Sequence, residues 1–296
     1  NFKVVRKNLW NYFDIKSEPL DTAEFRFKVK ESIHKVAKNI NKTALFLSGG
    51  MDSTLVASIL RDSEVDIEVF TCGYNTKQKG RYWAHHDFDW ESTMAVKTAR
   101  EYGYKVHRVV LERDDRFNLG KMWLANTHYL WSDMNRQAPR YLLCKAAAEA
   151  GCKVVLSGDS GDELFTGYIH HKPRFDPKVC EQQVEYFKTL RWFPYHAFGD
   201  DMMNNTLFAD LLVTSEQNIL ATDQTCGMFG MESRIPFLTQ SFVKYVLNIK
   251  GSIKFRQTKK FTRGTNKFLV REVMSQYLPD HVKNRVNKTG WTSPWD

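Results

Sequence analysis

The chain has 296 residues, of which 42% are hydrophobic and 26% charged, a composition typical of globular proteins. No apolar run approaches the roughly 18 residues of a membrane helix, and the N-terminus lacks the apolar core of a signal peptide. We therefore expect no membrane segment and a cytoplasmic protein. The net charge of +9 is concentrated at the two ends, with +8 in residues 250–296, which predicts an anionic ligand, either nucleic acid or phosphate.

Apolar residues recur every three or four positions over residues 22–40, which predicts an amphipathic helix. Short β-rich runs then alternate with helical stretches, the pattern of a doubly wound parallel α/β sheet. After about residue 170 the β-rich runs stop and the pattern is helical. We predict an N-terminal helical segment (1–42), an α/β core (43–170) and a helical C-terminal region (171–296) that completes the site. The expected strands are 43–47, 66–72, 106–111 and 153–156, and the expected helices are 52–61, 91–102, 138–150, 179–190, 207–220, 241–247 and 267–277.

The five cysteines form no C-x-x-C pair, which argues against a disulfide framework and against a zinc site. We expect reduced thiols, most of them buried.

Residues 48–53, with the sequence SGGMDS, lie where the first expected strand ends and a helix begins. Their two glycines permit a tight turn close to a ligand, and the N-terminus of the following helix favours an anion. Asp52 would repel a phosphate unless a cation lay between them, which suggests Mg²⁺. The alternative is a plain strand-to-helix turn with Asp52 in the first turn of the helix.

A second polar segment, residues 157–168 with the sequence SGDSGDELFTGY, follows the expected strand 153–156. Clustered carboxylates repel one another unless a cation intervenes, so a site for metal and phosphate is the economical explanation. Ligands of doubly wound sheets bind outside the carboxyl ends of the strands. Both segments lie at such ends, and we expect them to face each other across one crevice.

These segments resemble the signatures of a known family. Residues 48–53 match the pyrophosphate loop of the N-type ATP pyrophosphatases, and residues 157–168 match the second signature of the synthetase domain of asparagine synthetases. The likeness continues in order through residues 223–238, 267–271 and 278–291, so it covers the chain from about Trp10 to the C-terminus. It implies the adenine-nucleotide α-hydrolase (pyrophosphate-loop) type of α/β fold.

The resemblance also implies ATP-dependent amide formation with Mg²⁺: a carboxylate, most simply that of aspartate, attacks the α-phosphorus, and ammonia or another amine displaces AMP from the acyl-adenylate. Asp159 would hold or deprotonate the amine, and Lys288 would neutralise charge on the phosphates; with Asp52 these are the expected catalytic residues. Asp52 and Asp162 would hold the metal. The expected nucleotide contacts are Leu47, Ser48, Gly49, Gly50, Asp52, Ser53, Cys72, Ser157 and Gly158, and the expected substrate contacts are Asp162, Glu163, Asp223 and Glu232.

Some features depart from the family pattern. Ser160 and Thr166 stand where the family usually has glycine. Long members carry an N-terminal glutaminase domain that begins with a nucleophilic cysteine, and we expect none in this chain, so that nitrogen would come from free ammonia or a separate glutaminase subunit. Asp223, Glu232 and Arg234 have an alternative role as an ion-pair network that holds the helical region to the sheet.

Two other functions stay open. An amide-forming cyclase or ligase of the β-lactam or lasso-peptide type would keep the adenylation step and change the amine; β-lactam-forming relatives carry a tyrosine where Asp159 stands, which favours intermolecular amination here. A tRNA-modifying ATP pyrophosphatase would share residues 48–53 and fit the basic charge, but such enzymes lack the second segment. We therefore expect small-molecule substrates rather than nucleic acid.

Overall fold

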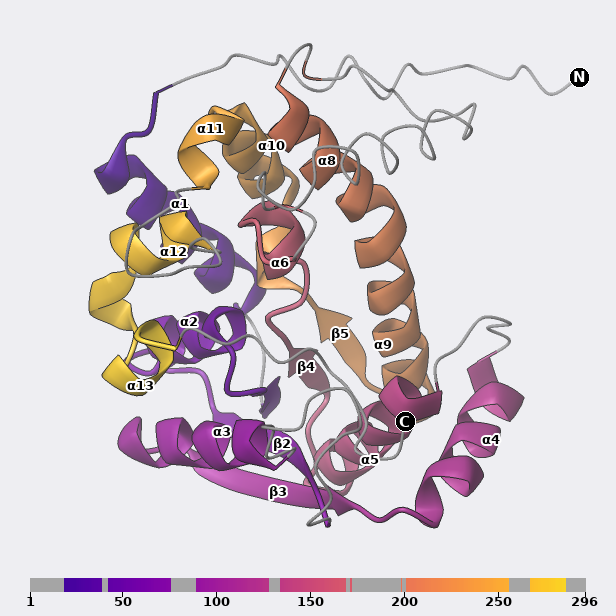
Figure 1. Ribbon diagram of the computed structural model, residues 1–296. Helices are drawn as coiled ribbons and strands as arrows, with labels where there is room; N and C mark the ends of the chain where they lie inside the picture. The colour runs from indigo at the N-terminus through magenta and orange to yellow at the C-terminus, as the bar shows by residue number, and fades with distance from the viewer. Residues whose placement is uncertain are drawn as a thin grey trace, which may run out of the picture.

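The computed structural model describes residues 19–38, 42–75, 89–127, 134–168, 171, 198, 201–255 and 267–285. Its centre is a five-stranded sheet in the order β3-β2-β1-β4-β5, with every pair of neighbours parallel (Figure 1). The strands are β1 (Thr43–Phe46), β2 (Ile67–Tyr74), β3 (Lys105–Leu111), β4 (Val154–Leu156) and β5 (Glu232–Arg234).

The helices of the first half confirm the predicted alternation of strand and helix, and α4 adds a helix that the sequence pattern did not indicate. In the second half, α8, a π turn named η3 and α9 follow one another without a break, where the sequence predicted a shorter helix over 207–220. The helices are α1 (Thr22–Val36), α2 (Met51–Leu60), α3 (Trp90–Glu101), α4 (Asp115–Thr127), α5 (Met134–Glu149), α6 (Gly161–Leu164), α8 (Met202–Asp210), η3 (Leu211–Ser215), α9 (Glu216–Met228), η4 (Pro236–Leu238), α10 (Gln240–Asn248), α11 (Gly251–Lys254), α12 (Phe268–Val273), η5 (Ser275–Tyr277) and α13 (Asp280–Lys283).

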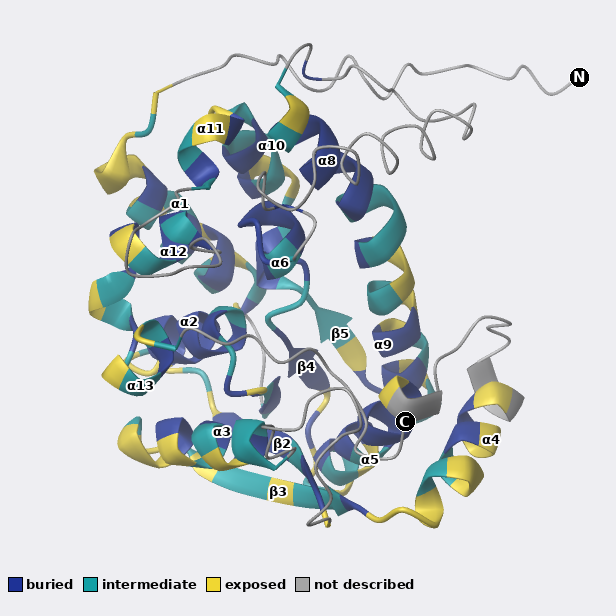
Figure 2. Ribbon diagram, viewed as in Figure 1, coloured by how far each residue is buried: buried dark blue, intermediate teal, exposed yellow. Residues whose placement is uncertain are grey.

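Alternate residues of β1 enter hydrophobic clusters on opposite faces of the sheet. Leu45 packs with residues of α1, α2 and α10, whereas Ala44 packs with residues of α5 and α9. This period of two, with both faces apolar, is what a parallel strand covered by helices requires. Figure 2 accordingly shows the inner strands β1, β2 and β4 mostly buried, the edge strands β3 and β5 only partly buried, and the outer sides of the helices exposed.

The prediction that no strand follows residue 170 was wrong. Glu232, Ser233 and Arg234 form β5, which pairs with β4 and extends the sheet at one edge. Three polar residues give no apolar run, so local sequence carried no strand signal; the strand forms because β4 offers an open edge. The predicted helix over 179–190 lies outside the described residues.

Two predictions from composition can be compared with the described part of the chain. Cys72, Cys144, Cys152 and Cys226 are free thiols and all but Cys72 are buried, as expected. Among the described helices, none is both long enough and apolar enough to cross a membrane.

Candidate functional site

The two polar motifs follow neighbouring strands. β1 leads into residues 47–50 and then α2, and β4 leads into residues 157–160 and then α6. β1 pairs with β2 on one side and β4 on the other, so connections run from this point toward both edges of the sheet. Such a switch point at the carboxyl ends of parallel strands is where doubly wound folds bind ligands.

The first motif forms a tight turn that leaves the start of α2 without a side-chain cap. Gly49 has a φ of +72°, and a Cβ there would lie 2.5 Å from the carbonyl oxygen of Glu91. Both the backbone conformation and the lack of space therefore require glycine at this position. The Ser48 hydroxyl lies 3.1 Å from that of Ser53 and accepts a hydrogen bond of 3.2 Å from the N–H of Gly50. No side chain caps the N-terminus of α2, whose N–H groups suit an anion.

The second motif packs directly against the first through two of its glycines. A Cβ on Gly158 would lie 2.4 Å from the backbone nitrogen of Ser53, and a Cβ on Gly161 would lie 2.4 Å from Cγ of Asp52. No real Cβ makes contacts this short, so these glycines permit the approach. The structure thus brings the two motifs together, as expected.

The ammonium group of Lys267 joins the carboxylates of the two motifs. It contacts Asp52 Oδ2 and lies 2.6 Å from Asp162 Oδ1. Lys267 is 5% exposed, and although burial alone would lower the pKa of its ammonium, the carboxylates of Asp162 and Asp52 raise it. Lys267 comes from the turn before α12, 215 residues from Asp52. The sequence motifs gave it no role; the available signals were its place in the basic segment 250–296 and in the family block 267–271.

The side chains of Asp52 and Asp162 fit the prediction of a Mg²⁺ site. Both present carboxylate oxygens to the same cation, Lys267, so they converge on one point. Mg²⁺ is commonly held by one or two carboxylates together with substrate phosphates. Within the described part of the chain, no group of three or more metal-binding side chains forms a protein-only metal site. This donor set suits a metal that arrives with a nucleotide.

Asp159 lies near Asp162, and a hydrogen bond orients its side chain. The Ser157 hydroxyl donates a hydrogen bond of 2.8 Å to its Oδ2. Burial raises the pKa of Asp159, and the guanidinium of Arg140 and the Ser157 hydroxyl partly oppose that shift. Arg140 comes from α5, is 3% exposed and also bonds Gln137 Oε1. It is a second charged neighbour of the site that the sequence did not single out, because its helix lies outside both motifs.

The comparisons with known proteins bear on this arrangement. A family model described as asparagine synthase matches residues 24–295. The chain belongs to the asparagine synthase family. The putative asparagine synthetase (glutamine-hydrolyzing) 1 of Methanocaldococcus jannaschii is 24% identical over 291 residues, which cover 88% of this chain and 47% of that protein. The root asparagine synthetase (glutamine-hydrolyzing) of Pisum sativum is 23% identical, covering 93% and 44%.

The chain spans less than half the length of these two relatives of the asparagine synthase family. Among solved structures, a U34-tRNA thiolase from Methanococcus maripaludis with its [4Fe-4S] cluster aligns with a TM-score of 0.38 and 17% identity, covering 76% of this chain and 63% of that one.

Glu163, one of the predicted substrate contacts, has a buried side chain. It is 2% exposed and accepts a hydrogen bond of 2.8 Å from the hydroxyl of Tyr168. Burial and the neighbouring Asp162 raise the pKa of Glu163 to about 8. The residue holds the second motif together from within.

The residues predicted to line the nucleotide pocket lie at the same edge of the sheet. Leu47 follows β1 and donates its N–H to the Phe70 carbonyl at 3.0 Å, and Ser157 follows β4. Cys72 lies in β2 two residues beyond Phe70, and burial raises the pKa of its thiol to about 12. A neutral thiol and buried backbone suit an uncharged base more than a phosphate.

Two predicted substrate residues, Asp223 and Glu232, make contacts of a different kind. Asp223 accepts a hydrogen bond of 3.1 Å from Ser233, which ties α9 to β5. Glu232 begins β5 opposite Val154, at the amino end of the strands, and its side chain is 61% exposed and paired with Arg234 at 2.9 Å. The structure does not bring Glu232 to the joined motifs. Its ion pair with Arg234 lies within β5, and Arg234 also donates to the carbonyl oxygens of Val36 and Lys38 at the end of α1, so a network that holds the helical region to the sheet stays a prediction. Lys288 lies outside the described residues.

Two arginines of the C-terminal segment add positive charge near the first motif. Arg271 donates to the carbonyl oxygens of Lys283 and Arg285 at 2.6 and 2.7 Å, and burial together with Arg285 lowers its pKa to about 10. Arg285 donates to Glu91 at 2.8 Å and stacks 4.5 Å above the ring of Trp90. Part of the basic excess near the C-terminus therefore surrounds the carboxyl edge of the sheet.

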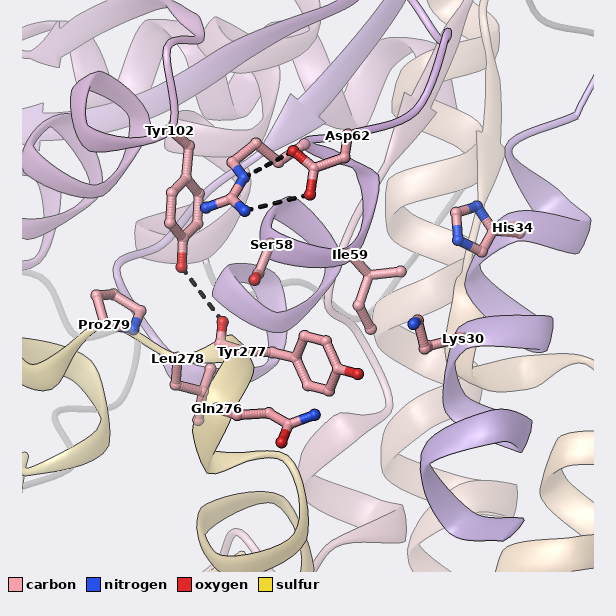
Figure 3. Close-up of a pocket in the computed structure, with 11 residues that line it drawn as sticks. Lys30, His34, Ser58, Ile59, Asp62, Tyr102, Gln276, Tyr277, Leu278 and Pro279 are labelled. Atoms are coloured by element: carbon pink, nitrogen blue, oxygen red, sulfur yellow. Dashed lines mark hydrogen bonds and ion pairs between the residues drawn. The ribbon is translucent and has the colours of Figure 1, made fainter. Parts of the chain in front are cut away.

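A pocket of about 590 Å³ lies apart from the joined motifs, between α1, the end of α2 and η5 (Figure 3). At its rim Arg61 pairs with Asp62 at 3.1 Å, and the hydroxyl of Tyr102 donates to the Tyr277 carbonyl at 3.3 Å. The predicted site residues do not line it.

Proposed function

We propose that this chain is the synthetase portion of an ATP-dependent amide-forming enzyme that works through an acyl-adenylate, with aspartate as the carboxylate and ammonia as the nitrogen source. The observation that carries the proposal is the convergence of Asp52 and Asp162 on Lys267 at the switch point of the sheet. Membership of the asparagine synthase family supports the same chemistry.

In the first step, a carboxylate oxygen of aspartate attacks the α-phosphorus of ATP, and the bond from that phosphorus to the bridging oxygen breaks to release pyrophosphate. The N–H groups at the start of α2 and the hydroxyls of Ser48 and Ser53 would hold the departing phosphates. Lys267 would move from the carboxylates to the phosphates when ATP binds. Mg²⁺ held by Asp52 and Asp162 would neutralise charge on the leaving group.

In the second step, the nitrogen of ammonia attacks the acyl carbon, the bond from that carbon to the AMP oxygen breaks, and AMP leaves with the electron pair. The nitrogen must lose a proton. Asp159 would accept it, since Ser157 fixes the carboxylate at the edge of the crevice and Arg140 favours its ionised form.

The decisive experiment incubates the protein with Mg²⁺, ATP, aspartate and ammonium and measures AMP, pyrophosphate and asparagine. We expect all three in equal amounts. Release of ADP and inorganic phosphate would overturn the adenylation step. AMP release with no asparagine would leave adenylation standing and overturn the choice of substrates; candidate amines tested without ammonium would then identify a cyclase or ligase of the β-lactam or lasso-peptide type.

A pair of asparagine variants tests the site. Asp52→Asn should lower the rate of AMP formation by at least about 100-fold, because it removes a metal ligand and the partner of Lys267. The matched control is Asp280→Asn, a carboxylate that is 83% exposed and paired with Lys283 on the surface, for which we expect wild-type turnover. Equal turnover of both variants would contradict the assignment of the site. Glutamine supplied with a separate glutaminase, in place of ammonium, would test the expected partner subunit.

A further inference from the structure

The long helix beside the second motif is interrupted once. α8 and α9 run as one continuous rod in Figure 1, and the five residues between them, Leu211–Ser215, form the π turn η3. A π turn is an α-helix with one extra residue, closed by i→i+5 hydrogen bonds, and it is often found at functional sites.

Ser215, at the end of the π turn, contacts the second motif segment, and Asp210, just before the turn, contacts His171, three residues beyond that segment. Asp210, which immediately precedes the turn, lies 2.6 Å from Nε2 of His171 through its Oδ2. Ser215, the last residue of the turn, contacts the hydroxyl of Ser160 through its own hydroxyl. Both are nearly inaccessible to solvent, with 2% exposure for Asp210 and 1% for Ser215.

The π turn explains how Ser215 reaches the second motif segment while Asp210 reaches His171 just beyond it. Residues five apart in a regular α-helix point about 140° away from each other, because each residue turns the chain by about 100°. One π turn brings residue i+5 back to about the direction of residue i. Asp210 and Ser215 therefore lie on one face of the helix, and α6 packs against α8 and η3 on that face.

The two contacts bracket the part of the motif that carries Asp162. Ser160 precedes α6 and has a φ of 66°, in the left-handed region. This conformation is strained for a serine and persists only where surrounding contacts stabilise it. At the other end, Nδ1 of His171 accepts the N–H of Tyr168 at 3.2 Å, which leaves the proton on Nε2 to be donated to Asp210.

The bracketed segment is folded tightly around Asp162. A Cβ on Gly167 would lie 1.7 Å from Asp162 Oδ1, so the backbone of the loop touches this carboxylate directly. Any displacement of the loop at Ser160 or Tyr168 would therefore move the oxygen that faces Lys267.

We propose that the π turn, through Asp210 and Ser215, is a positioning element that holds Asp162 where it binds the metal of the metal–nucleotide complex. The inference rests on the proposed function, because it assumes that Asp162 acts on Mg²⁺ that arrives with ATP. Asp210, Ser215 and His171 act through Asp162 and touch neither substrate nor metal.

Serine and aspartate variants test the two contacts. The equilibrium dissociation constant of ATP is measured by calorimetry with and without Mg²⁺ for Asp210→Ala and Ser215→Ala. We expect each variant to bind ATP about 10-fold more weakly in the presence of Mg²⁺ and with unchanged affinity in its absence. The matched control is Thr222→Ala, which removes an equally buried hydroxyl that bonds to its own helix at Asn218, and which should behave as wild type.

The length of the π turn provides a second test, in which we expect a one-residue deletion to be tolerated and a one-residue insertion to be harmful. Deletion of Thr214 converts the π turn into α-helix and leaves Asp210 and Ser215 four residues apart, still on one face. We expect this variant to bind ATP with Mg²⁺ within about threefold of wild type. Insertion of an alanine after Val213 should weaken binding about 10-fold or more, because it rotates the two residues apart.

The outcomes separate this inference from the proposed function. Wild-type protein whose affinity for ATP does not respond to Mg²⁺ would overturn the proposed site itself. If wild type responds, wild-type affinity in both alanine variants, or an equal loss with and without Mg²⁺, would refute the positioning role. A deletion variant that binds worse than the insertion variant would also refute it.

Discussion

At the scale of single residues, two glycines of the second motif permit its close approach to the first. Gly158 faces the backbone of Ser53 and Gly161 faces the side chain of Asp52. In the first motif, the sequence explains glycine by a tight turn and a nearby ligand. The structure adds a different reason in the second motif. A methyl group at Gly158 or Gly161 would push the two motifs apart, and with them the carboxylates of Asp52 and Asp162.

A substitution at Gly161 tests this reason. Gly161→Ala would place Cβ 2.4 Å from Cγ and 2.8 Å from Cβ of Asp52, so the aspartate must turn away from Lys267. We expect AMP formation to fall by at least about 100-fold, because the metal site is lost. Gly227→Ala in α9 is the matched control: nothing lies within 4 Å of its added Cβ, and we expect unchanged activity and about 0.5–1 kcal/mol of added stability. Activity of the Gly161 variant near that of the control would contradict this account.

The ion pairs of Lys267 lead to a prediction about metal binding. It is buried between two carboxylates, and removing one partner of a buried ion pair typically costs about 3–5 kcal/mol of stability. Lys267→Met should lower the melting temperature in metal-free buffer, and Mg²⁺ should restore much of the loss by taking the place of the ammonium. Thermal unfolding with increasing Mg²⁺ measures this. A melting temperature of Lys267→Met that responds to Mg²⁺ no more than that of wild type would argue against a metal site at Asp52 and Asp162.

Ser160 and Thr166 show how a departure from a family pattern gains a physical meaning. The family pattern given above has glycine at both positions, and in this structure both residues adopt a positive φ, 66° for Ser160 and 60° for Thr166. Glycine adopts this region without cost, whereas other residues need compensation. Here the hydroxyl of Ser160 contacts Ser215, and that of Thr166 donates to the Lys254 carbonyl at 3.2 Å. These contacts offset part of the strain.

At the scale of elements, the sequence predicted those whose signal is local. Short β-rich runs and helical stretches of the sequence placed β1 to β4 and the helices α1, α2, α3, α5 and α10 within about four residues of their bounds. β5 was missed because its pairing partner, and not its polar sequence, determines its conformation. Lys267 was missed for a related reason: its role depends on a contact with Asp52 across 215 positions. Motif spacing predicted that two loops meet, but it carried no information on which distant cation joins them.

The N-terminus of α1 provides a prediction at this scale. Asp21 caps the helix by accepting hydrogen bonds from the N–H groups of Ala23 and Glu24 at 2.8 and 3.0 Å. Asp21→Ala should lower the free energy of unfolding by about 1 kcal/mol, since an N-cap replaced by alanine leaves helix donors unsatisfied. Urea unfolding measures it. Asp21→Ser should retain most of the stability, and a loss as large as that of alanine would show that charge, not capping, is responsible.

At the scale of the whole molecule, the two ends of the sheet carry different chemistry. The carboxyl ends hold the joined motifs, whereas Glu68, near the amino end of β2, is surrounded by two lysines and a histidine. Its carboxylate lies 2.9 Å from Lys42, 3.0 Å from Lys105 and 2.5 Å from His107. The ring of His107 stacks on Phe70 with centroids 4.5 Å apart. This cluster ties the segment before β1 to β2 and β3, so it bears on the stability of the sheet and not on the site.

Glu68 gives the fold a dependence on pH that is separate from catalysis. Although burial alone would raise its pKa, hydrogen bonds from Lys42, Lys105 and His107 lower it to about 2, against an ordinary value of 4.5. A depressed pKa stabilises the folded state above about pH 4.5, and the contribution is lost as pH falls from there toward 2. Lys105 is 64% exposed, so screening reduces the contribution to about 2 kcal/mol. Glu68→Gln should therefore unfold at lower urea than wild type between pH 7 and 5, and the gap should narrow as pH falls below 4.5. A gap that stays constant from pH 7 to pH 3 would mean that the glutamate stabilises the sheet through packing instead of charge.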